Sequence, residues 1–217
     1  MKRKCSVLGC LNPRLAKGLC SKHWNRQRAG KPLLTAKEQF IRDNPPKDGV
    51  GLVPLTQGHV AIVDAADYPM VIRKQWSVKP AEGGLLYAAC SVPNGKTTTT
   101  MTLHRFILEA SDGELIDHQN SNGLDNRKSN IRLATPLENS RNSRKLRKAT
   151  SRFKGVSWDS KSAQWRAQIR FKGKQRHLAL CDSEEDAATY YDVAAQILFG
   201  PFAYTNAQHR LAMASAA

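Results

Sequence analysis

The chain has 217 residues, of which 41% are apolar, and this fraction excludes a single large core and predicts two or three small units. Its 34 Lys and Arg against 18 Asp and Glu give a formal charge of +16, which points to a polyanionic partner, nucleic acid or an anionic membrane. No stretch approaches 18 apolar residues and the start MKRKCSVLGC lacks the apolar run of a signal peptide, so we expect no membrane partner and a cytoplasmic location.

The basic residues fall in two blocks. Residues 1–31 contain nine Lys and Arg and no acid, and residues 141–177 contain 13 against one acid. Residues 32–140 are near neutral, with 11 basic and 12 acidic side chains, and residues 178–217 have one against five. The pattern predicts two basic surfaces on separate modules that flank a neutral centre.

The first module has possible metal ligands with the spacing C-x4-C-x9-C-x2-H, namely Cys5, Cys10, Cys20 and His23. Three thiolates and an imidazole suit structural Zn²⁺, and so short a segment cannot bury a core without a metal. Free or disulfide-linked cysteines are the alternative. The segment resembles the zinc-binding knuckle at the front of many phage-type nucleases. Residues 32–50, which contain two consecutive prolines, are expected to be a linker.

A scaffold of antiparallel strands is expected next, because β-branched and aromatic runs alternate between glycine turns. The expected strands lie within residues 53–64, 76–78, 85–92 and 96–103. A short helix is expected near residues 65–74, and LHRFILEA at 103–110 begins a second one.

An asparagine-rich stretch follows this scaffold. Residues 114–118 are expected to form a strand that ends in Asp117-His118, and residues 130–134 a second strand. Pro136 then opens a helix, with Thr135 as its cap. Two strands and a helix would place Asp117, His118 and Asn139 together, while amide side chains satisfy the backbone of the loop. The alternative is a polar surface loop with an incidental histidine.

This arrangement resembles the HNH nuclease family, in the branch of the intron-encoded homing endonucleases of phages. LHRFILEA, DHQNSNGLDNRKSNIRLAT and ENSRN carry the resemblance, which covers roughly residues 51–145. It implies a ββα-metal centre that hydrolyses DNA phosphodiesters in a bacterial or phage-infected cytosol. His118 would be the general base, because imidazoles ordinarily titrate near neutral pH. Asp117 and the amide oxygen of Asn139 would hold Mg²⁺ or Mn²⁺.

The same resemblance implies roles for four further residues. Asn130 would pin the loop and orient His118, and Asn126 would stabilise the loop. Arg105 would clamp the scissile phosphate. His104, at the start of a helix, is either catalytic or structural.

The C-terminal module is expected to have three strands followed by a helix. The second strand, QWRAQIRF, alternates between an apolar face and a face of Gln and Arg. The helix over residues 184–199 is capped by Ser183 and stopped by Gly200. Because the acids lie on the helix, only the basic face of the sheet can approach phosphate.

This module resembles the AP2 (ethylene-response-factor) DNA-binding domain through FKGVSW, WRAQIR, EEDAATYYDVAA and the later FG and TN. The resemblance implies that a sheet enters the major groove of DNA. It assigns DNA contacts to six residues, Lys154, Trp158, Arg166, Arg170, Arg176 and His177. Ser157, Gln175 and Ala179 depart from the family, so its base preference does not carry over. A solvated basic sheet is the alternative.

Together these patterns and resemblances predict an α+β protein with a zinc knuckle, an HNH nuclease on an antiparallel scaffold, and an AP2-like sheet with a helix. The expected function is metal-dependent nicking of double-stranded DNA, with a monomer favoured. A DNA-binding regulator with an inactive nuclease core is the alternative, and an RNA-directed nuclease is a third reading. The expected boundaries are 1–31 for the knuckle, 32–50 for a linker, 51–145 for the nuclease, 146–149 for a second linker, 150–206 for the AP2-like domain and 207–217 for a tail.

Overall fold

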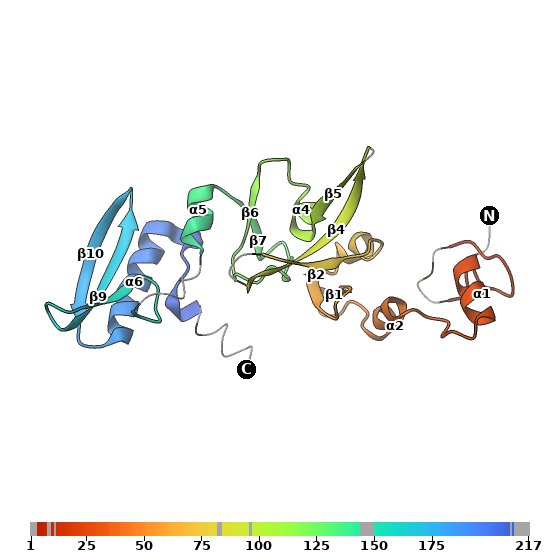
Figure 1. Ribbon diagram of the computed structural model, residues 1–217, viewed down its shortest axis with the longest axis horizontal. Coiled ribbons are helices and arrows are strands. Elements are labelled where there is room, and N and C mark those ends of the chain that lie inside the picture. The colour runs from red at the N-terminus through yellow and green to blue at the C-terminus, as the bar shows by residue number, and fades with distance from the viewer. Residues whose placement is uncertain are drawn as a thin grey trace. The chain divides into compact units, whose positions relative to one another are not determined.

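The computed structural model describes residues 4–7, 10, 12–81, 84–95, 97–143, 150–208 and 210 (Figure 1). Two compact units divide the chain, Met1–Ile107 with Leu124–Lys128, and Leu108–Gly123 with Ser129–Ala217. The described residues form four sheets built from antiparallel strand pairs, which confirms the predicted mixture of helices and antiparallel sheets. Among these described residues, every helix is too short or too polar to cross a membrane.

The first unit begins with two helices and continues as strands. Its elements are α1 (Ser21–Arg28), α2 (Ala36–Asp43), β1 (Val50–Pro54), β2 (Val60–Asp64), α3 (Tyr68–Val71), β3 (Ser77–Pro80), β4 (Leu86–Asn94), β5 (Thr97–Thr102) and α4 (Leu103–Leu108). β1 pairs with β2, and β4 lies between β3 and β5. Val53, Val63, Val71 and Leu103 of these elements are fully buried, as is Trp76 directly before β3.

One sequence prediction in this unit needs correction, and a helix lies within the segment expected to be a linker. Residues 32–50 were expected to be a linker, but they contain α2, because Thr35 and Glu38 form a reciprocal capping box at its start. The helix expected near residues 65–74 is only the single turn α3. The capping box of α2 is a local feature that composition does not reveal.

Part of the predicted asparagine loop packs onto β2. Ile62 N donates to Leu124 O at 2.8 Å, and Asn126 N donates to Ile62 O at 2.7 Å. Lys128 N donates to the Asp64 carboxylate at 2.8 Å. Residues 124–128 are therefore held by β2 as an added extended segment.

The second unit holds a two-stranded sheet with a helix, and then a three-stranded sheet with a helix. Its elements are β6 (Leu115–His118), β7 (Ile131–Ala134), α5 (Pro136–Arg141), β8 (Val156–Asp159), β9 (Gln164–Phe171), β10 (Lys174–Cys181), α6 (Glu184–Phe199) and η2 (Gly200–Phe202). The predicted linker at 146–149 lies outside the described residues.

The three-stranded sheet and α6 share a core (Figure 1). Ala187, Ala188 and Ala195 of α6 are fully buried, so this face of small residues lies close against the sheet. Gly155 is required before β8, because its φ is +73° and a Cβ there would lie 1.9 Å from the Tyr191 ring. Asp192 of α6 is buried and its carboxylate accepts from Asn206 N at 2.7 Å.

Candidate functional site

Four side chains with metal-binding atoms converge in the first unit. The donor atoms of Cys5, Cys10, Cys20 and His23 all lie within 4.8 Å of one another. His23 Nδ1 lies 3.3 Å from Cys5 Sγ and 3.4 Å from Cys20 Sγ, and Cys10 Sγ lies 3.9 Å from Cys20 Sγ. A tetrahedral zinc centre has bonds of about 2.0–2.3 Å and so ligand-to-ligand edges of about 3.5–3.8 Å. The cluster could hold Zn²⁺.

The local fold brings these ligands together. Cys20 is the residue before α1, so His23 follows it within the first helical turn. Ser6 N donates to Gly18 O at 2.8 Å, and Cys20 N donates to Cys5 Sγ at 3.3 Å. Burial disfavours the Cys20 thiolate, but hydrogen bonds from the His23 backbone and the Cys10 thiol outweigh burial and lower the pKa of Cys20. The thiolate is the form that binds a metal.

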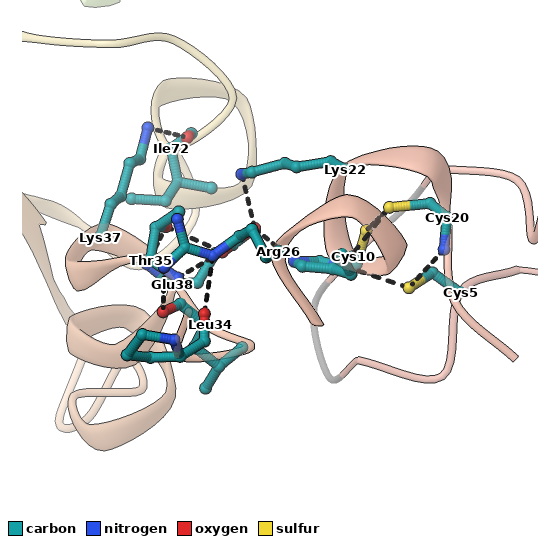
Figure 2. A network of polar contacts seen from close by, with 12 residues as sticks. Cys5, Cys10, Cys20, Lys22, Arg26, Leu34, Thr35, Lys37, Glu38 and Ile72 are labelled. Atoms are coloured by element: carbon teal, nitrogen blue, oxygen red, sulfur yellow. Dashed lines mark hydrogen bonds and ion pairs between the residues drawn. The ribbon is translucent and has the colours of Figure 1, made fainter. Parts of the chain in front are cut away.

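Glu38 of α2 is a partner of this cluster that the sequence analysis did not identify (Figure 2). Its Oε1 lies 3.0 Å from His23 Nε2 and accepts from Lys22 Nζ at 2.9 Å. Its Oε2 accepts from Thr35 N and Oγ1, both at 2.8 Å. Burial opposes ionisation of Glu38, but the hydrogen bonds from Thr35 and Lys22 hold its pKa at about 2. The carboxylate therefore fixes the ring that presents Nδ1 to the thiols.

Replacing Glu38 with glutamine is expected to weaken zinc binding by about 10–100-fold, because an amide is a poorer acceptor for the His23 ring N–H. Competition with a chromogenic chelator measures this affinity. Glutamine still fits a capping box, so α2 should remain helical. Glu138→Gln is a matched control, because Glu138 forms the same capping box with Thr135 in α5 and belongs to the other unit. Equal zinc affinities of the two variants would contradict the assigned role.

A second candidate site lies at the end of β6. Antiparallel pairing with β7 sets Asp117 opposite Arg132 and His118 opposite Ile131. Both Asp117 and His118 are buried, with 4% and 5% of their surfaces exposed. A two-stranded sheet followed by α5 is the local arrangement that the sequence predicted for these residues.

Asp117 is held from two sides. Its Oδ2 accepts from Arg132 Nη2 at 2.6 Å and from Arg132 Nε at 3.0 Å. Its Oδ1 accepts from Asn142 Nδ2 at 2.7 Å, and the same amide donates to His118 O at 2.9 Å. A carboxylate has about four acceptor positions, so three are filled and one on Oδ1 remains. That position suits one hard cation.

The asparagines of this region occupy different positions. Asn130 is buried, and its Oδ1 accepts from Asn120 N at 3.0 Å, which pins the loop. Asn139 is exposed on α5, and within residues 97–143 no hydrogen bond joins its side chain to Asp117. The amide that reaches Asp117 belongs to Asn142, three residues further on, because the chain leaves α5 at that point.

His104, Arg105 and Asn126 belong to the first unit, whereas Asp117 and His118 belong to the second. His104 Nε2 lies 2.9 Å from Thr102 Oγ1, and its ring meets the Tyr87 ring edge-on. Asn126 is fully buried. The contacts with Thr102 and Tyr87 show that His104 packs within the first unit at the start of α4.

The residues assigned to DNA contact fall into two groups. Trp158, Arg170, Arg176 and His177 are exposed on the three-stranded sheet or its turns. Arg166 forms an ion pair with Asp159. Lys154 Nζ donates to the carbonyls of Arg141 and Ser143 at 2.6 and 2.7 Å, and burial lowers its pKa to about 8. The structure therefore gives the Lys154 ammonium two backbone carbonyl partners within the protein.

The sequence contained partial signals for Arg132, Asn142 and Glu38, which were not among the predicted site residues. Arg132 directly faces Asp117 once the two strands are paired, and opposite charges at facing positions attract. Asn142 ends the ENSRN motif. Glu38 carries the signature of a capping box after Thr35, but its contact with His23 had no signal in the local sequence.

Fold and sites together define the class: a mixed α/β protein with antiparallel sheets, a Cys₃His cluster suited to zinc, and a buried Asp-His pair on a two-stranded sheet. An uncharacterized HNH endonuclease of Acanthamoeba polyphaga mimivirus is 32% identical over 156 residues, which are 69% of this chain and 76% of that protein. Protein 3.8 of Escherichia phage T7 is 35% identical over 105 residues, 46% of this chain and 86% of that protein. The chain belongs to the HNH endonuclease family.

No family model matches the chain, and no solved structure matches it significantly.

Proposed function

We propose that the chain is a metal-dependent endonuclease that nicks double-stranded DNA. The observation that carries the proposal is the Asp117-His118 pair, with a carboxylate held by Arg132 and Asn142, in a member of the HNH endonuclease family. One such centre per chain cuts one strand, so nicking is the expected product.

His118 would remove a proton from the attacking water. Asp117 would hold Mg²⁺ or Mn²⁺ through the remaining acceptor position of Oδ1, and the exposed amide of Asn139 would be the second oxygen ligand. The bound cation would neutralise the charge that develops on the phosphate and the leaving oxygen. Asn130 would keep the loop after His118 in place, since it binds the backbone of Asn120.

Duplex DNA is the proposed substrate for three reasons. A relative is named an endonuclease, the formal charge is +16, and the exposed Arg170 and Arg176 lie on the three-stranded sheet. A groove of about 470 Å³ extends the basic surface, because Arg141, Arg170 and Lys172 contribute to its wall. We assign targeting to this AP2-like sheet, as in a homing endonuclease, and the N-terminal cluster to structural Zn²⁺.

The experiment that tests the proposed function is nicking of supercoiled plasmid by the full chain with Mg²⁺, with Mn²⁺ and with a chelator. Cleavage that requires the divalent ion is expected. Structured RNA in parallel reactions tests the substrate class, and preferential cleavage of RNA would contradict the proposal.

The burial of His118 favours a second candidate function. With 5% of its surface exposed, the imidazole has little access to a water nucleophile in this conformation. A DNA-binding regulator with an inactive nuclease core would need no such access. The two candidates differ in one result, because the regulator binds DNA but leaves plasmid intact with either ion.

Replacing Arg170 with alanine is expected to weaken specific DNA binding by about 1–3 kcal/mol and to relax preference at one base position. Arg170 is exposed on β9 and faces the side that α6 leaves open, so its guanidinium can reach a base edge. Selection from a random duplex library, followed by anisotropy titrations, measures both effects. Arg73→Ala, which removes an exposed arginine of the first unit, is the control; an unchanged site preference for Arg170→Ala would count against the sheet as the reader of sequence.

A further inference from the structure

Arg132 contacts β6, the residue that follows β6 and the segment that follows α6, and its Nη1 donates to Gln119 Oε1 at 3.3 Å. Toward β6, its Nη2 and Nε donate to Asp117 Oδ2 at 2.6 and 3.0 Å. Toward the end of the C-terminal module, its Nη1 donates to Pro201 O at 2.8 Å, and its guanidinium lies 3.8 Å from the centroid of the Phe202 ring. One side chain therefore joins the candidate catalytic carboxylate to the segment that follows α6.

The chemistry of these contacts is specific to arginine. The planar guanidinium can bind a carboxylate through two parallel donors while its face stacks on an aromatic ring and a third donor stays available. The side chains of Arg132 and Asp117 are only 15% and 5% exposed. A buried carboxylate whose partner moves away is left uncompensated, so the position of Arg132 controls the state of Asp117.

The other donor to Asp117 is held by the same module. Asn142, which donates to Asp117 Oδ1, lies between Arg141 and Ser143 in the chain. The carbonyls of both neighbours accept from Lys154 Nζ, which is in the segment before β8. The Arg141 guanidinium also lies 4.7 Å from the centroid of the Phe199 ring at the end of α6. Both donors to the carboxylate are thus fastened to the AP2-like module.

We infer that the AP2-like module is part of the support of the catalytic centre, with Arg132 as a positioning residue for Asp117 and Phe202 as its platform. This inference rests on the proposed function, because it takes Asp117 to be the metal-binding carboxylate. The module then has two tasks, because it offers a basic sheet to DNA and also keeps the metal-binding carboxylate in place. Loss of the Phe202 ring should disturb the carboxylate without touching the exposed face of the sheet.

The test uses full-length Phe202→Leu, which keeps an apolar side chain but removes the ring under Arg132. We expect Mn²⁺ affinity, measured by electron paramagnetic resonance, and the single-turnover nicking rate each to fall by about 10-fold or more. DNA affinity by anisotropy should stay unchanged. Phe202→Tyr retains the ring and should restore both values. Tyr190→Leu is the matched control, because Tyr190 is 55% exposed on α6, and it should behave as the parent protein.

Thermal unfolding separates failure of this inference from failure of the proposed function. Asp117→Asn and Phe202→Leu are combined, and their shifts in Tm should be non-additive, because both act on Arg132. Additive shifts, or unchanged Mn²⁺ affinity in Phe202→Leu, would overturn the inference. If the parent protein neither binds Mn²⁺ nor nicks DNA, the proposed function fails, and the Tm comparison still decides whether Arg132 joins the two positions.

Discussion

Replacing His118 with alanine is expected to reduce the rate of plasmid nicking by about 10²–10⁴-fold, the range for loss of a general base. The imidazole follows Asp117 on β6, so its loss removes the proton acceptor and leaves the carboxylate with its donors Arg132 and Asn142. DNA affinity should not change, since His118 is buried and distant in sequence from the exposed basic face. Single-turnover time courses with Mn²⁺ and anisotropy titrations measure the two quantities.

His59→Ala is the control for this substitution. His59 is exposed in the turn between β1 and β2, and its loss should leave nicking unaltered. A His118→Ala protein that nicks as fast as the parent would show that another group activates water. Because His118 is buried, a parent protein that binds DNA but never nicks would select the inactive-core candidate instead.

Replacing Cys20 with serine is expected to abolish zinc binding and to unfold the N-terminal module. The parent chain should carry about one zinc per molecule, and zinc binding of this kind contributes about 10–16 kcal/mol in small zinc-finger peptides. Cys20 Sγ lies within hydrogen-bonding distance of both His23 Nδ1 and Cys10 Sγ, so its loss breaks the cluster at its centre. Plasma mass spectrometry gives the zinc content, and limited proteolysis reports whether residues 1–31 are folded.

Cys181→Ser is the matched control for the zinc prediction. Cys181 is a buried free cysteine of β10 that packs in the core of the C-terminal module, so the same chemical change should leave zinc content unaltered. Absence of zinc from the parent protein, or full zinc content in Cys20→Ser, would contradict the assignment of these four residues as zinc ligands.

Elements governed by local signals could be predicted closely from the sequence. The bounds of β9 and α6 agree with the prediction, because strict alternation marks one, and Ser183 and Gly200 mark the ends of the other. Thr135 caps α5 as expected. α2 shows the limit of this approach, since its capping box lies in a segment whose prolines suggested a linker.

The candidate ligands and the candidate base could likewise be named from residue types and spacing. The types and spacing of Cys5, Cys10, Cys20 and His23 mark them as one ligand set, although Cys5 lies 18 residues from His23 and the chain must fold back to bring the two together. Asp117 and His118 are adjacent in the chain, so no long-range packing is needed to bring them together.

The partners of these groups depended on packing between segments that are distant in the chain. Glu38 lies 15 residues from His23, and Pro201 lies 69 residues from Arg132. No periodicity or spacing rule connects such pairs, because the geometry of several intervening elements sets their separation. Thus the sequence by itself determined the chemistry of the site residues and the local conformation around them. The side chains that orient each site were decided by the tertiary structure, because only folding brings those distant elements into contact.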